Sequence, residues 1–218
     1  MTSTKTLATV AALGGILQFA LGLTAYQIDA ATVLPDLGQP ARVQAAHLAA
    51  HPAGGLFWTT VALETAGLVL FLAFAAYLAQ RLREAGAPAW LAATARAVAT
   101  TAIAVKLSSL APALAAIQHP HAYGDATAAA LLQVNGYGDQ VMLALQGSFY
   151  LAVAAAALTA RAPRWLSGLA LVGGVATVAA GFGFDSGQLG GIAVTLATAA
   201  WLLRRPSVAV PTPVPVEA

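Results

Sequence analysis

The chain has 218 residues, of which 59% are hydrophobic and 8% are charged, whereas soluble domains carry roughly 25% charged residues. Its net charge of +2 is too small for a basic surface that would bind nucleic acid. The absence of cysteine excludes disulfides, thiolate catalysis and Cys-ligated metal. A soluble surface cannot be built from this composition, which indicates a membrane protein.

Apolar runs of about 20 residues, roughly the number that crosses a ~30 Å hydrocarbon layer as a helix, recur along the chain. The first run is too long for the core of a cleaved signal peptide and has no clear cleavage site, so we expect it to be retained. The sequence predicts an all-α, polytopic membrane helix bundle in which residues 1–205 form the transmembrane domain. The six predicted transmembrane helices are 7–28, 55–80, 89–117, 139–160, 165–184 and 187–203.

The longer connections between these helices have different characters. Residues 29–54 and 118–138 are polar, and within them residues 40–51 and 124–136 have the composition of short helices that lie on the membrane surface. Residues 206–218 contain four prolines and no periodicity, which predicts a disordered, proline-rich tail.

Orientation follows from the basic residues, because Lys and Arg are retained on the cytoplasmic side of short loops. One side of the predicted bundle has only Arg42. Both termini are therefore predicted to be cytoplasmic, in the plasma (inner) membrane of a bacterium, with 29–54 and 118–138 facing outward. The cytoplasmic basic residues are Lys5, Arg81, Arg83, Arg96, Arg161, Arg164, Arg204 and Arg205.

Small residues follow a helical spacing in the fifth and sixth predicted helices. Gly173, Thr177 and Gly181 lie four residues apart, and Gly187 and Gly191 repeat this interval. Such faces let helix backbones approach closely within a membrane. They indicate packing inside the chain, or contact with a second copy or another membrane protein; the lipid bilayer itself is the expected surrounding.

Two opposite charges lie inside consecutive predicted helices. Glu64 is nine residues from the outer start of its helix, or roughly 14 Å deep at 1.5 Å per residue, and Lys106 is eleven residues from the outer end of the next, or roughly 16 Å deep. Either charge alone would cost about 2.5–3.5 kcal/mol near the bilayer centre. Because consecutive antiparallel helices are usually neighbours, we expect Glu64 and Lys106 to form an ion pair.

Other polar side chains lie at comparable depth and extend this buried polar site. They are Gln18, Asp139, Gln146 and Tyr150. One interpretation is structural, since buried polar groups can fix the register of helices. The other is a proton or solute site that opens to the outside, because ionisable groups inside membranes mark pathways. Pro112 would loosen the helix close to Lys106, which favours a cavity and a transporter-like or ligand-binding module.

All four histidines fall in the two outward connections. His47 and His51 have the i, i+4 spacing that can chelate a metal on a helix, and His119 and His121 flank a proline. No cofactor is predicted from these residues alone, but extracytoplasmic metal or haem binding is an alternative function. The other interpretation is of side chains at the membrane surface that titrate near neutral pH.

No catalytic motif is present. The sequence has no Walker loop, no G-x-S-x-G and no dinucleotide-binding fingerprint after a strand. Catalytic residues are therefore not assigned, and an enzyme is disfavoured; a non-catalytic accessory subunit is a further alternative.

Two stretches carry a resemblance in layout to a known group of proteins. They are "AAHPAGGLFWTTVALETAGLVLFLAFAAYL", with an acid early in the second helix, and "ARAPRWLSGLALVGG", with a Pro-Arg-Trp turn before the fifth. In these the chain resembles a family of bacterial, actinobacterial-like six-helix integral membrane proteins of unknown function. The resemblance implies a fold and a location, and no catalytic residue.

Overall fold

The computed structural model describes residues 4–32 and 34–204, and in this part of the chain it is all-α, with seven α-helices, one short 3-10 turn and no strand. The helices are α1 (Thr4–Thr32), α2 (Ala41–Ala50), α3 (Gly55–Glu84), α4 (Ala89–Gln118), α5 (Asp125–Thr159), α6 (Arg164–Ala180) and α7 (Gln188–Arg204). The 3-10 turn η1 (Asp185–Gly187) precedes α7. The proline-rich tail predicted at 206–218 lies outside the described residues.

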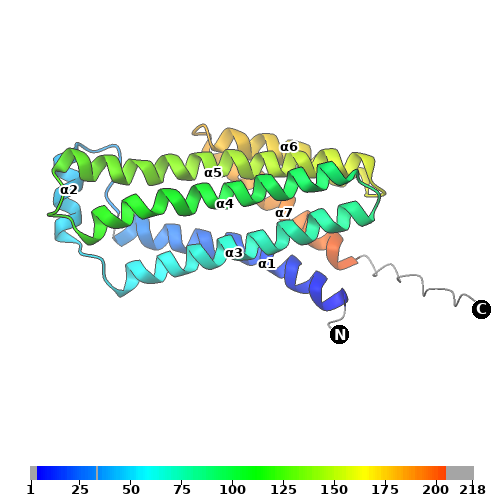
Figure 1. The fold of residues 1–218 in the computed structure, drawn as a ribbon, viewed down its shortest axis with the longest axis horizontal. Coiled ribbons are helices and arrows are strands. Elements are labelled where there is room, and N and C mark those ends of the chain that lie inside the picture. Colours follow the sequence, from blue (N-terminus) through cyan, green and yellow to red (C-terminus); the bar gives the residue numbers. More distant parts are fainter. Residues whose placement is uncertain (1–3, 33, 205–218) are drawn as a thin grey trace, which may run out of the picture.

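Six of the helices form a closed ring. Helices α3, α4, α5, α6 and α7 each pack against the next, and α1 packs against both α3 and α7. The short helix α2 lies across one end of the bundle and contacts α5 (Figure 1). The start of α1 and the end of α7 lie at the opposite end. We call the end covered by α2 the α2 end, and the other the turn end, because the α3–α4 and α5–α6 turns lie there.

The predicted helical segments are present, but one boundary is wrong. The sequence predicts a connection at 118–138, whereas α5 already begins at Asp125 and runs for 35 residues. The segment 124–136 is therefore the first part of a long helix and not a separate surface helix. Gly136 and Gly138 suggest a loop in the sequence, yet in the helix they serve close packing, because a Cβ at Gly136 would lie 2.9 Å from Leu37. The short helix predicted at 40–51 is confirmed as α2.

Four helices are long and apolar enough to cross a membrane: Thr6–Ile28 within α1, Gly55–Glu84, Ala89–Gln118 and Asp125–Thr159. Helices α6 and α7 have 17 residues each, which is at the lower end of the roughly 17–25 residues of membrane-spanning helices. The fold is thus a helical bundle with four candidate membrane spans among the described residues.

Two apolar layers fill the interior at different levels. Towards the turn end, the side chains of Phe74, Leu78, Phe149, Val153 and Leu166 belong to one large buried cluster. At the α2 end, a second cluster contains Leu48, Phe57, Ala113, Ile117 and Leu132. Each of α3, α4 and α5 contributes to both clusters, so residues between these positions on the same helix faces lie between two apolar layers.

Small residues bring α6 close to both of its neighbours. A Cβ at Gly147 of α5 would lie 2.5 Å from the Val178 nitrogen and 2.7 Å from the Gly174 oxygen of α6. On the other side of α6, a Cβ at Gly173 would lie 2.7 Å from the Gly190 oxygen of α7. These glycines pack inside the chain; a second copy or a partner protein on α6 and α7 stays a prediction.

We expect Gly147→Ala to destabilise the bundle, because the added methyl group meets backbone atoms that cannot move aside. Overpacking of this kind costs about 1–3 kcal/mol, and for a chain of this size each kcal/mol lowers the melting temperature by about 2–4 °C. Thermal unfolding of the detergent-solubilised protein measures this. The matched control is Gly168→Ala in α6, where nothing lies within 4 Å of the new Cβ; equal melting temperatures for the two variants would contradict the expectation.

Candidate functional site

The ammonium group of Lys106, on α4, contacts three oxygen atoms from two neighbouring helices. Its Nζ lies 2.9 Å from Glu64 Oε1 of α3 and 2.6 Å from Asp139 Oδ1 of α5. It also donates a hydrogen bond of 3.1 Å to Asn135 Oδ1 of α5. A lysine ammonium has three N–H donors, so every donor has an acceptor. We call Glu64, Lys106, Asn135 and Asp139 the Lys106 cluster.

Helix periodicity places each member of the cluster on an inward-facing stripe. Glu64 lies between Phe57 and Phe71, seven residues from each and therefore on nearly the same side of α3, and both phenylalanines are buried. On α5, Asp139 is likewise seven residues after Leu132. These flanking residues belong to the two apolar layers, so the Lys106 cluster lies between the layers.

A close approach of α4 and α5 brings the cluster together. A Cβ at Gly138 would overlap the Ser109 side chain, so only glycine allows this separation next to Asp139. The Ser109 hydroxyl donates to the Lys106 carbonyl oxygen at 2.9 Å, which keeps it within its own helix. Gly138 and Ser109 therefore set the distance across which Lys106 reaches Asp139.

The contact between Glu64 and Lys106, predicted from their matching depths, is present in the structure. Asn135 was not among the predicted site residues, because the sequence placed it in a connection. If the predicted helix had begun at Asp125, Asn135 would have been predicted to join Asp139 in the site, because residues at i and i+4 share one face of a helix.

The members of the cluster differ in exposure. The Lys106 side chain is 3% exposed, whereas those of Glu64 and Asp139 are 28% and 41% exposed. Both acids stand on the inward-facing stripes of α3 and α5. The ammonium is thus enclosed, while its two carboxylates stay partly accessible.

Gln146 and Tyr150 form a separate polar group deeper in the bundle. Gln146 Nε2 lies 3.5 Å from the Tyr150 hydroxyl, which is 2.7 Å from Thr195 Oγ1 of α7. Tyr150 and Thr195 are completely buried. Gln146 and Tyr150 lie on the same stripe of α5 as Asp139, but no hydrogen bond joins them to the Lys106 cluster among the described residues. Gln146 and Tyr150 therefore form a polar group of their own with Thr195.

Gln18, on α1, lies near the level of Glu64 on α3. A Cβ at Gly67, about one turn after Glu64, would lie 3.2 Å from the Gln18 carbonyl oxygen. The side-chain nitrogen of Gln18 is buried and has no hydrogen-bond acceptor within the described part of the chain. Gln18 thus has an unused side-chain donor, and its backbone lies beside Gly67 of α3.

The histidines of α2 contact each other. The rings of His47 and His51 are stacked with centroids 4.2 Å apart, and His51 Nδ1 lies 3.0 Å from the His47 carbonyl oxygen. His119 and His121 follow the end of α4. Across residues 4–32 and 34–204, no group of three or more His, Cys, Asp or Glu side chains is placed to hold a metal ion. A metal or haem site at these four histidines stays a prediction.

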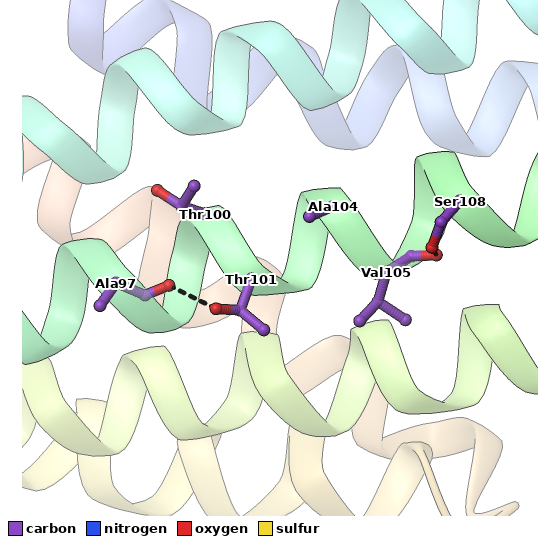
Figure 2. Close-up of a pocket in the computed structure, with 6 residues that line it drawn as sticks. All are labelled: Ala97, Thr100, Thr101, Ala104, Val105 and Ser108. Atoms are coloured by element: carbon purple, nitrogen blue, oxygen red, sulfur yellow. Dashed lines mark hydrogen bonds between the residues drawn. The ribbon is translucent and has the colours of Figure 1, made fainter.

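An open depression of about 630 Å³ lies on α4, away from the Lys106 cluster. Figure 2 shows its six lining residues, all from α4: Ala97, Thr100, Thr101, Ala104, Val105 and Ser108. Lys106 projects from the other side of the helix, and the hydroxyls of Thr101 and Ser108 donate to carbonyl oxygens of their own helix. The depression is thus a feature of the outer surface with no free polar group of its own.

No protein family, curated protein or solved structure matches this chain. The geometry of the Lys106 cluster is therefore the basis for the function proposed below.

We expect Lys106→Met to destabilise the protein strongly, because it leaves two neighbouring carboxylates without their cation. Breaking a buried ion pair costs about 3–5 kcal/mol, and the lower part of that range is expected here because Asp139 is partly exposed. The triple variant Glu64→Gln, Lys106→Met, Asp139→Asn removes all three charges and should recover most of the loss. Thermal unfolding compares the two; a triple variant no more stable than Lys106→Met would show that the charges are not coupled.

Proposed function

We propose that the chain is a six-span integral membrane protein that binds a small polar solute at the Lys106 cluster, in the manner of a transporter or a membrane-embedded ligand-binding module. The observation that carries this proposal is the difference in exposure: the carboxylates of Glu64 and Asp139 are accessible on inward-facing stripes, whereas Lys106 is enclosed. Accessible acids beside a satisfied ammonium can accept hydrogen bonds from a solute.

The six-span arrangement is supported by the ring. Helices α6 and α7 are short, but they close the ring between α5 and α1 and expose large apolar side chains such as Leu171, Val172 and Leu196. A 17-residue helix is roughly 25 Å long, close to the ~30 Å of the hydrocarbon core. With six spans, both termini lie on one side, which the distribution of Lys and Arg makes cytoplasmic.

The location follows from this orientation. We assign the chain to the plasma (inner) membrane of a bacterium, with the α2 end facing outward. A place in the actinobacterial-like family of six-helix membrane proteins is part of the same proposal and rests on the two stretches of sequence that resemble it.

Orientation can be tested with single cysteines, because the chain contains none. Ala122→Cys, at the α2 end, should react with a membrane-impermeant maleimide in intact cells. Arg83→Cys, near the turn end, should react only after the membrane is permeabilised. Both positions are exposed, so access alone separates them; reversed labelling would place the termini on the outer side.

The solute site is tested by Asn135→Cys, which puts a thiol beside Lys106. We expect a small, charged methanethiosulfonate reagent added from outside to modify this thiol, because the acids around it are accessible. The matched control is Val153→Cys on the same helix. Val153 is completely buried in the apolar layer at the turn end, so its thiol should stay unmodified. If Asn135→Cys is inert while Ala122→Cys reacts, the cluster does not open outward and the proposed function is wrong.

A further inference from the structure

The Lys106 cluster contains one more acid than base. Two carboxylates, Glu64 and Asp139, contact a single ammonium, and Asn135 is neutral. With all three groups ionised, the cluster has a formal charge of −1. A net charge between two apolar layers is costly, and a single added positive charge would neutralise the cluster.

Lys106 cannot neutralise the cluster by changing its own protonation state. All three donors of its ammonium are used by Glu64, Asn135 and Asp139, which is the pattern of the charged form. Loss of its proton would leave a formal charge of −2. The additional positive charge therefore has to reside on the carboxylates.

A metal cation fits this position poorly. The place between the two carboxylates, where a cation would bind both, is occupied by the Lys106 nitrogen at 2.9 and 2.6 Å. No group of three or more metal-binding side chains exists in the described ranges, and hard cations take six or more oxygen ligands in the case of Ca²⁺ and Mg²⁺. A proton on a carboxylate oxygen needs no such coordination shell.

Among the described residues, no further ion pair joins the cluster. On α1, the described side chains of residues 6–28 include no Asp, Glu, Lys or Arg. On α2, the groups are Arg42, His47 and His51, separated from the cluster by the apolar layer that contains Leu48. Tyr150, further along α5, is neutral as a phenol and bonded to Thr195. The charge balance of the cluster is therefore set within the cluster.

We propose that Glu64 and Asp139 share one exchangeable proton, so that the Lys106 cluster binds a single proton as its ligand or as the ion coupled to its solute. The step is a simple addition: a proton from water on the outer side bonds to a carboxylate oxygen, giving a carboxylic acid, and the same bond breaks on release. This inference rests on the proposed function, because it assigns the ligand class of the same site.

Infrared spectroscopy of the full chain in lipid nanodiscs tests the proposal through the C=O stretch of a protonated carboxyl group. At about pH 6, ordinary exposed carboxyls, which titrate near pH 4, are ionised and do not contribute. We expect one protonated carboxyl per wild-type chain, and none in either Glu64→Gln or Asp139→Asn, because each substitution removes the surplus charge. Lys106→Met should increase the band about twofold, since two carboxylates are then left without a cation.

The matched control is Glu84→Gln, which removes an exposed acid paired with Arg81 at the turn end and should leave the band unchanged. A wild-type protein without the band, or a band that survives in either Glu64→Gln or Asp139→Asn, would overturn the proposal. Both of these substitutions nearly preserve shape, so the test stands even if Lys106→Met does not fold. The reactivity of Asn135→Cys reports access to the cluster, so a missing band with a reactive thiol rejects this inference alone.

Discussion

The ammonium of Lys106 constrains the arrangement of three helices. An unpaired cation at this depth would cost about 2.5–3.5 kcal/mol or more, and the chain avoids this cost only if α3 and α5 bring oxygen atoms to α4 at one level. Glu64 fixes the level of α3, and Asn135 and Asp139 together fix that of α5. A slip of α5 by one turn, roughly 5.4 Å, would put Leu131 or Leu143 in the place of one of these two acceptors, so the cluster specifies the register as well as the charge.

Packing on both sides of the cluster makes this register attainable. Gly138 and Ser109 let α4 and α5 approach closely beside Asp139, and Gly147 does the same between α5 and α6. The apolar layers above and below then exclude water from the rest of the interior. The Lys106 cluster is closely packed against neighbouring helices and lies between two apolar layers, so few polar residues are needed to build it. This is consistent with a chain that has only 8% charged residues.

Much of the fold and part of the site could be predicted from the sequence. The contact of Glu64 with Lys106 follows from counting residues from helix ends, because helix rise is constant and neighbouring helices are antiparallel. The start of α5 could not be predicted, since Gly136 and Gly138 serve close packing of helices, and the same residues are typical of loops. The bond from Tyr150 to Thr195 depends on how α7 is rotated about its axis, which is set by contacts such as Gly190 with Gly173 and leaves no periodic signal.

The two apolar layers differ in what it would cost to open them, and this difference favours access from the α2 end. The layer at the turn end includes the completely buried side chains of Phe74, Leu78, Phe149, Val153 and Leu166, each worth about 1.5–3 kcal/mol of burial. Helix α2 contributes only one large apolar side chain, Leu48, to the other layer. Lifting α2 would expose that side chain at a cost of about 1.5–3 kcal/mol, in addition to the apolar side chains that it covers. The Gln44 side chain bonds to the carbonyl oxygens of Leu37 and Gln39, within the same segment, so these bonds can move with α2. The α2 end is therefore covered by fewer large apolar side chains than the turn end, and the layer that contains Phe57, Ile117 and Leu132 lies between α2 and the acids of the Lys106 cluster.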